Sequence, residues 1–285
     1  MAVDVGPSDW EITPHTTGLR QTVSDAWRHR RLLGFLSTRA VQKMYRRTVL
    51  GWVWLFINPL FPLALRALIF GGLIGVSSEG IPYFLFLVAG SIAWDTFASS
   101  LTWGTRGLEM NRHLVDQIYV PRALLPFGNT APALLDFAIK LAAFAVAIGY
   151  YLAADDRIYV RGGIPLLWAV AALGLVFALS SALTFFTSVW GEATRDMRFT
   201  LGQLLSIWYL LTPVLYPLSA VPERYRDWML ANPMAVVVET FKWGLFGTGE
   251  LRPMAFRVTA AAIGALWLAG LMYFARAEAQ AIAER

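Results

Sequence analysis

Residues 106–126 read RGLEMNRHLVDQIYVPRALLP and separate two apolar stretches, residues 82–103 and 128–153, that are each long enough to cross a membrane. Arranged as a helix, this segment has an apolar flank opposite a charged one. The apolar flank consists of Leu108, Val115, Ile118 and Tyr119, and the charged flank of Arg106, Glu109, Arg112, His113 and Asp116. The pattern predicts a membrane protein in which a rigid polar helix on the cytoplasmic side joins two spans, where another protein can push on it.

The composition of the whole chain agrees with membrane insertion. Of its 285 residues, 57% are hydrophobic and only 15% are charged. Soluble domains average about 25% charged residues. The net charge of +5 is not typical of a nucleic-acid-binding surface, because the basic residues cluster beside the apolar stretches. We therefore predict an all-α integral membrane protein with no nucleic-acid partner.

The chain lacks the residues that several kinds of chemistry require. It has no cysteine and its three histidines are isolated, so neither thiolate catalysis nor a metal site is expected. Its three lysines, at positions 43, 140 and 242, do not belong to a phosphate-binding Gly-x-x-x-x-Gly-Lys-Ser/Thr loop, and no Gly-x-Ser-x-Gly motif is present. We expect no catalytic residue, no metal and no cofactor in this chain.

Six apolar stretches approach the length of about 20 residues that a membrane-spanning helix needs. They are residues 50–75, 82–103, 128–153, 164–189, 201–217 and 254–274. The fifth is short and ends between two prolines, so it is expected to run into a turn. An even number of spans places both termini on the same side of the membrane.

The distribution of lysine and arginine predicts which side that is. Fifteen of these residues flank the spans on the side of the N-terminus, against seven on the other side when Arg257, near the start of the last stretch, is counted there. Both termini are therefore expected in the cytoplasm. Residues 1–23 and 275–285 are predicted to form cytoplasmic tails, and residues 50–274 the six-span domain.

Residues 24–49 are predicted to form an amphipathic helix in the plane of the membrane interface. Its apolar stripe comprises Leu33, Leu36, Ala40, Val41 and Met44, and its polar side comprises Arg31, Arg39, Gln42, Lys43 and Arg46. Two roles remain open, and both can hold together. The helix either anchors the chain to membrane lipids or offers a docking surface to a partner.

Residues 218–253 form a long connection on the outer side, for which we predict re-entrant or interfacial helices. Within it residues 234–246 are apolar but too short to cross the membrane. A further complete span here is rejected, because Glu239 and Lys242 would then lie in its middle.

Three ionisable residues lie at membrane depth, where charges are costly: Asp95, Asp136 and Lys140. Asp136 and Lys140 are four residues apart and share one helix face, and Asp95 is within reach on the neighbouring span. A structural ion pair is favoured over a proton relay. Arg66 is expected to extend toward the outer boundary, with contact to a substrate phosphate as the alternative.

Several short strings, in this order along the chain, resemble one family. They are YRRTVLGWVW at 45–54 followed by Asn58-Pro59, NRHLV at 111–115 followed by IYVPR at 118–122, RDMRF at 195–199, and LTPVLYP at 211–217 with Val221-Pro222 and Asn232-Pro233-Met234. Together they resemble the permease subunits of ABC-2-type exporters of polysaccharides, the family that handles O-antigen, capsule, teichoic acid and related lipid-linked glycans. The resemblance spans residues 45 to about 245.

The resemblance implies a half-transporter that forms a homodimer and recruits two copies of a separate ATPase subunit, which binds ATP and Mg. It implies a polyprenyl-linked polysaccharide as substrate, and contact with the ATPase through residues 106–126. The candidate coupling residues are Arg106, Glu109, Arg112, His113, Leu114, Asp116, Tyr119 and Arg122. Asp116 departs from the basic residue expected in many relatives.

A glycan path favours aromatic side chains, because sugar rings stack their C–H faces on aromatic planes. The candidates are Trp52, Phe56, Phe70, Tyr83, Trp94, Trp208, Tyr209 and Tyr216. Each is also explained by core packing or by an interfacial aromatic belt. The alternative functions are an ABC-2 exporter of a small lipophilic compound and, with less support, a membrane-embedded transferase.

Overall fold

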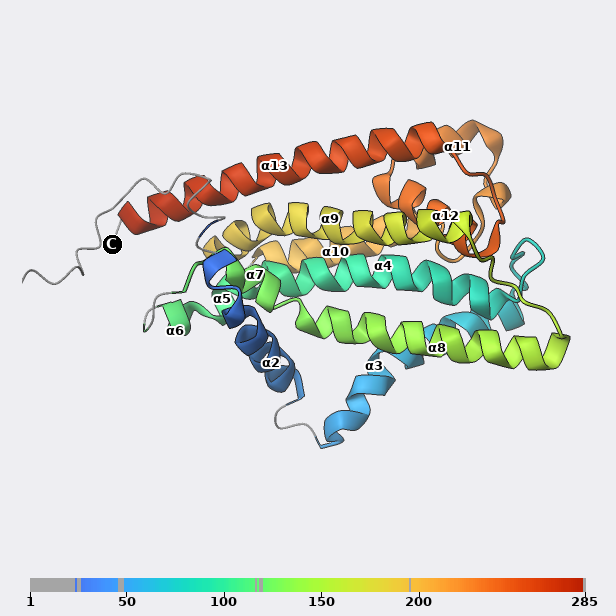
Figure 1. Ribbon diagram of the computed structural model, residues 1–285, viewed down its shortest axis with the longest axis horizontal. Coiled ribbons are helices and arrows are strands. Elements are labelled where there is room, and N and C mark those ends of the chain that lie inside the picture. Colours follow the sequence, from blue (N-terminus) through green and yellow to red (C-terminus); the bar gives the residue numbers. More distant parts are fainter. Residues whose placement is uncertain are drawn as a thin grey trace, which may run out of the picture.

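A computed structural model describes residues 24, 27–45, 49–115, 117, 120–194 and 196–283 of the chain. Every regular element in this part is helical, which confirms the prediction of an all-α protein. Long helices lie side by side in one elongated bundle (Figure 1). The predicted tail at residues 1–23 lies outside the described residues.

Within the described part, five helical stretches are long and apolar enough to cross a membrane: Gly51–Leu73, Tyr83–Thr105, Leu124–Asp155, Ile164–Ala193 and Pro253–Gln280. They correspond to five of the six predicted stretches. The helices that form them are η1 (Gly51–Val53), α3 (Trp54–Arg66), η2 (Ala67–Leu73), α4 (Tyr83–Thr105), α7 (Leu124–Gly128), α8 (Ala131–Asp155), α9 (Ile164–Ala193) and α13 (Pro253–Ala283).

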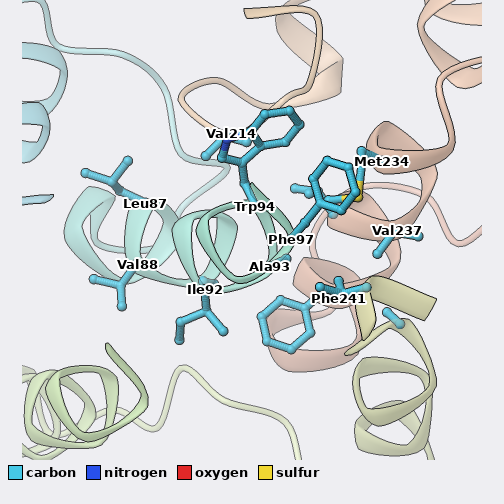
Figure 2. Close-up of a cluster of buried hydrophobic side chains, with 14 of the residues drawn as sticks. Leu87, Val88, Ile92, Ala93, Trp94, Phe97, Val214, Met234, Val237 and Phe241 are labelled. Atoms are coloured by element: carbon cyan, nitrogen blue, oxygen red, sulfur yellow. The ribbon is translucent and has the colours of Figure 1, made fainter. Parts of the chain in front are cut away.

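Helix α4 forms the centre of the bundle. Of the most apolar 18-residue segment of α4, 78% is buried inside the protein. Of the corresponding segment within residues 51–73, only 11% is buried. An apolar helix without a polar face is typical of such a buried position. Ile92 and Phe97 of α4 meet Met234 and Phe241 in the main hydrophobic core (Figure 2). The first stretch, in contrast, lies at the edge of the bundle.

The fifth predicted span is helical over only part of its length. Helix α10 (Asp196–Leu210) has 15 residues, and an irregular segment, residues 211–217, continues it. Buried carbonyl groups of this segment accept hydrogen bonds from side chains: Pro213 from Lys242, and Leu215 from the Tyr83 hydroxyl at 2.9 Å. Irregular backbone is tolerated at membrane depth when its polar groups are satisfied in this way. The count of six spans requires α10 and residues 211–217 to cross the membrane together as the fifth span, and it stays a prediction.

Two shorter helices follow, α11 (Glu223–Leu230) and α12 (Pro233–Phe246), after the single turn η3 (Leu218–Ala220). Helix α12 begins beside α10, where Asn232 accepts a hydrogen bond from Trp208. It ends against the first turns of α9, where the Leu245 carbonyl accepts a hydrogen bond from the Arg161 amide at 2.6 Å. The pair thus folds back into the bundle at the end that also carries the start of α13 (Figure 1).

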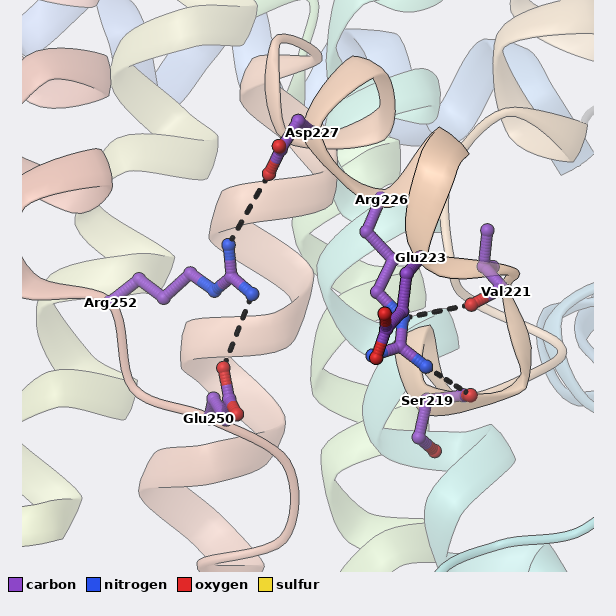
Figure 3. Close-up of polar contacts among 7 residues, drawn as sticks. All are labelled: Ser219, Val221, Glu223, Arg226, Asp227, Glu250 and Arg252. Atoms are coloured by element: carbon purple, nitrogen blue, oxygen red, sulfur yellow. Dashed lines mark hydrogen bonds and ion pairs between the residues drawn. The ribbon is translucent and has the colours of Figure 1, made fainter.

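Ion pairs fasten this end of the molecule. Arg252, just before α13, lies 3.8 Å from Asp227 of α11 and 3.2 Å from Glu250 (Figure 3). Arg226 donates hydrogen bonds to the carbonyl groups of Val221 and Ser219 and so fixes the turn before α11 (Figure 3). Helix α11 is therefore held at both of its flanks.

The opposite end of the bundle is built from α2 (Arg31–Tyr45), α5 (Gly107–Met110), α6 (Arg112–Val115) and α7. We call residues 106–128 the elbow, and this side the elbow end. The last turns of α13 lie at the same end (Figure 1).

Within the predicted amphipathic region 24–49, helix α2 covers Arg31–Tyr45, and residues 25, 26 and 46–48 lie outside the described residues. Leu36 and Ala40 of α2 are both 3% exposed, and Leu36 packs so closely on Gly128 that a Cβ atom there would lie 2.5 Å from it. The apolar stripe of α2 therefore packs on the bundle itself, while Phe35 remains 56% exposed.

Candidate functional site

The elbow is not the single helix that its periodicity predicts. Helices α5 and α6 are separated at Asn111, whose backbone leaves the helical region with φ −113° and ψ 11°. The buried Asn111 side chain donates a hydrogen bond to the Gly107 carbonyl at 2.9 Å, which favours the turn over a continuing helix. Pro121 then precedes α7 and has no amide hydrogen to continue a helix.

Close packing sets the angle between the two halves of the elbow. A Cβ atom on Gly107 would lie 2.6 Å from Cα of Pro126 and 2.8 Å from the Leu125 carbonyl oxygen. Only glycine allows α5 to approach α7 this closely. Leu108, Leu124 and Leu125 are buried in a second hydrophobic cluster together with residues of α2, α9 and α13. The elbow is therefore attached firmly to the bundle.

Two ion pairs connect the elbow to the helices behind it. Glu109 of α5 lies 3.0 Å from Arg198 near the start of α10. Arg122, before α7, pairs with Glu192 in the last turn of α9. The amide of Arg122 also donates a hydrogen bond to Glu278 of α13 at 3.3 Å. These contacts join the elbow to α9, α10 and α13.

Helix α2 is tied to the elbow as well. Lys43 donates a hydrogen bond to the Met110 carbonyl at 2.9 Å. Partial burial, and after it the positive charge of Arg39, lower the pKa of Lys43 below its usual range.

The predicted coupling residues have different positions. Arg112 and His113 of α6 are exposed and available to a partner. Arg106 lies over the Trp103 ring at 5.7 Å. Leu114 packs against the second hydrophobic cluster. Glu109 and Arg122 point toward the bundle, as described above, while Asp116 and Tyr119 lie outside the described residues.

The charged residues at membrane depth form one group. Lys140 of α8 lies 2.8 Å from Asp95 of α4, so the two helices are joined by an ion pair. Asp136 shares a 3.5 Å contact with the Ser99 hydroxyl, and its other oxygen is buried without a hydrogen-bond partner in the described structure. The ion pair thus forms between helices, with Asp136 beside it.

Arg66 also belongs to this group, so the expectation that it extends to the outer boundary is wrong. Its guanidinium lies 3.6 Å from Asp95 and 5.2 Å from the centre of the Tyr209 ring, and it donates a hydrogen bond to Ser91. The expectation assumed an upright helix that rises about 1.5 Å per residue from the cytoplasmic side, which places Arg66 too close to the outer boundary. Helix α3 contains Pro59 and crosses the bundle obliquely, so it gains less depth per residue (Figure 1).

The candidate aromatic residues fall into three classes. Trp52 and Phe56, on the first stretch, are 67% and 56% exposed. Trp94 is only 4% exposed and lies in the core (Figure 2). Its ring meets those of Trp208 and Tyr209, with ring centres 6.1 Å and 5.5 Å away. In this position its ring packs against other side chains, and its assignment as a path residue stays a prediction. Phe70, Tyr83, Trp208, Tyr209 and Tyr216 are partly buried.

Sequence reasoning did not predict the ion pairs of the site. It named residues 192–198 as a second segment on which the ATPase could press, but it did not pair Arg198 or Glu192 with the elbow. A signal for them existed in the charged string at 192–198, between two apolar stretches, but sequence spacing does not identify a pairing partner 70 or more residues away. Buried Lys242 likewise supports the irregular segment after α10.

Comparison with known proteins identifies the family of the chain. Its sequence is 28% identical over 260 residues to the O-antigen export system permease protein RfbA of Myxococcus xanthus, an alignment that covers 90% of this chain and 96% of that protein. It is 26% identical over 221 residues to the corresponding Klebsiella pneumoniae protein, covering 77% and 82%. It is 25% identical over 205 residues to the polysialic acid transport protein KpsM of Escherichia coli, covering 72% and 77%. Because the model of the ABC-2 type transporter family matches residues 31–246, the chain belongs to that family.

Proposed function

We propose that this protein is the membrane-spanning subunit of an ATP-driven exporter that moves a lipid-linked polysaccharide across the bacterial cytoplasmic membrane. The observation that carries the proposal is the similarity to O-antigen and polysialic acid export proteins over most of the chain. The family match includes both α2 and the elbow. The chain itself has no phosphate-binding loop, so a separate ATPase supplies the energy.

The elbow is the proposed contact with that ATPase. Arg112 and His113 are exposed on α6 and offer charge to a partner surface. Behind them, Glu109 is paired with α10 and Arg122 with α9. Movement of two ATP-binding subunits, one for each copy of the chain, would therefore press on the elbow and shift these helices together. ATP and Mg are bound by the partner and not by this chain.

The proposed homodimer forms at the edge of the bundle that consists of α3 and α10. The polysaccharide path then lies between the two copies at this edge. Arg66 and Asp95 are 26% and 19% exposed there, although they lie at membrane depth. Charged groups in a membrane face protein or a wet cavity rather than lipid. Exposed Trp52 and Phe56, with partly buried Tyr209, supply ring surfaces on the same helices for sugar faces.

The proposed orientation places the elbow end in the cytoplasm. The excess of lysine and arginine on that side supports it. Helices α11 and α12 then belong to the outer side, where they dip into the bundle and return. Exposed Trp27 and Phe35 of the N-terminal region are available to membrane lipids on the cytoplasmic side.

The test is co-expression of the full chain with a candidate ATPase from the same genome. We expect the two proteins to purify together, and depletion of the chain to leave lipid-linked polysaccharide inside the cell. Arg112→Glu should weaken co-purification, whereas Arg257→Gln, at the opposite end of α13, should leave it unchanged. Transport by the chain alone would contradict the proposal. It would also be contradicted if cells depleted of the chain kept their surface polysaccharide and instead retained a small lipophilic compound.

A further inference from the structure

A cavity of about 680 Å³ lies between the ends of α9 and α13 at the elbow end. This volume is in the range of about 300–1,000 Å³ that small-ligand sites occupy. Its lining combines apolar Val189 and Phe274 with charged residues, among them Arg276. Helix α13 forms the outer edge of the bundle, so the cavity is on the perimeter and away from α3 (Figure 1).

The aromatic side chains at this cavity indicate how deep it lies relative to the membrane surface. Tyr273, which lines it, accepts a hydrogen bond from the Trp190 indole at 2.8 Å and stacks on Phe186 with ring centres 5.3 Å apart. Tyrosine and tryptophan concentrate at the boundary between hydrocarbon and headgroups. Tyr273 is twenty residues after Pro253, the start of α13. At about 1.5 Å per residue, that distance equals the roughly 30 Å hydrocarbon core.

The charges of the cavity favour an anion. It is lined by three arginines, Arg112, Arg122 and Arg276, and by two glutamates, Glu192 and Glu278. Arg122 and Glu192 neutralise each other, and Glu278 is turned toward the Arg122 amide. Arg112 and Arg276 are exposed and make no ion pair with another described residue. The remaining charge is therefore positive, at the level where lipid phosphates lie.

An apolar surface leads from the cavity toward the middle of the membrane. On α13, Met272 and Leu268 are 46% and 56% exposed, one turn apart. On α9, Trp190 is 48% exposed and its indole contacts Tyr273 of α13. The surface is thus positively charged at the arginines and apolar toward the middle of the membrane. It matches a molecule whose anionic head lies at the arginines and whose apolar tail points into the membrane.

We infer that this cavity binds the phosphate of an anionic phospholipid of the membrane leaflet at the elbow end. The Arg276 guanidinium binds phosphate oxygens, for which its planar donor group is suited, while the acyl chains lie along Leu268 and Met272. Arg122 is already paired with Glu192 and forms part of the cavity wall. The site lies beside the elbow but does not depend on which compound the protein transports.

The test measures lipid retention by the purified full-length chain. The protein in mild detergent is incubated with equal amounts of phosphatidylglycerol and phosphatidylethanolamine, and the bound lipids are counted by native mass spectrometry. We expect phosphatidylglycerol to be retained preferentially. Arg276→Gln should lower its retention roughly fivefold, which corresponds to about 1 kcal/mol for one arginine at an anionic lipid surface. Arg276→Lys should keep most of it.

Arg257→Gln is the matched control, because Arg257 is an exposed arginine on the opposite end of the same helix. It should retain as much phosphatidylglycerol as the unchanged protein. Equal retention by Arg276→Gln and the control would overturn the inference, as would displacement of phosphatidylglycerol by an equimolar polyprenyl diphosphate. Because no ATPase and no transport are involved, the result is independent of the proposed function.

Discussion

The guanidinium of Arg198, near the start of α10, lies 3.0 Å from the carboxylate of Glu109 in the elbow. The pair is about a third exposed, and both Arg198 Nε and one Glu109 oxygen lack a hydrogen-bond partner among the described residues. Such a pair contributes little to stability, about 0–1 kcal/mol. Because it lies between the proposed ATPase contact and the shortest of the predicted membrane passes, we predict a mechanical role for the pair instead.

Glu109→Gln should therefore lower export while leaving thermal stability nearly unchanged. The neutral amide keeps the shape of the side chain but removes the charge that holds Arg198. Exchange of the two charges, Glu109→Arg with Arg198→Glu, should restore part of the export, because the pair then forms in the reverse sense. Surface polysaccharide and the melting temperature are the two measurements. A double variant no better than the single one would contradict this role.

Asp95→Asn should be strongly destabilising. Asp95 is the counter-ion of both Lys140 and Arg66, and Lys140 is only 6% exposed at membrane depth. Removing one member of a buried ion pair costs about 3–5 kcal/mol, because the other charge is left uncompensated. Thermal unfolding in detergent measures the loss. Adding Lys140→Met to Asp95→Asn should recover part of it, since only one of the two cations left without Asp95 is then gone.

Asp136→Asn is the control for this group. Asp136 has one 3.5 Å contact with Ser99 and an oxygen without a partner, so an amide is accommodated at small cost. An Asp136 variant as unstable as the Asp95 variant would contradict the assignment of Asp95 as the central counter-ion.

Gly107→Ala should destabilise the elbow by about 1–3 kcal/mol, the usual cost of overpacking. The added methyl group would lie within 2.8 Å of backbone atoms of Leu125 and Pro126, which cannot rotate away. Gly202→Ala is the matched control, because no atom lies within 4 Å of its position on α10. That variant should be neutral or more stable, since alanine favours a helix by up to about 1 kcal/mol. Equal melting temperatures of the two variants would show that α5 and α7 are not in close contact.

The membrane architecture was predictable because it depends on local composition. Apolar stretches of about 20 residues identify spans without knowledge of their neighbours. The break at Asn111 was not predictable in this way. Residues on both sides of it continue the helical period, and the turn depends on a buried side-chain bond and on the glycine contact between α5 and α7.

The position of Arg66 illustrates a second limit. Its depth was calculated from a helix standing upright, whereas the tilt of α3 is set by packing against other helices, which the sequence does not state. The pairing of Lys140 with Asp95 needed less information, because both residues lie on long helices that are neighbours along the chain. Local patterns therefore reveal the spans, and long-range contacts determine the site.

Asn232→Ala should unfold the region where α10 passes into α12. The Asn232 carbonyl oxygen accepts hydrogen bonds from the Trp208 indole at 2.7 Å and the Met234 amide at 2.9 Å, while its amide group donates to the Leu211 carbonyl and the Thr212 hydroxyl. Alanine removes the cap of α12 and leaves buried groups unpaired, at a combined cost of about 2–4 kcal/mol. Asn232→Asp keeps both acceptor contacts and loses only the two donors, so it should be destabilised about half as much. Melting temperature and tryptophan fluorescence report the difference, and an aspartate variant as unstable as the alanine variant would show that the donors, not the cap, hold the irregular segment in place.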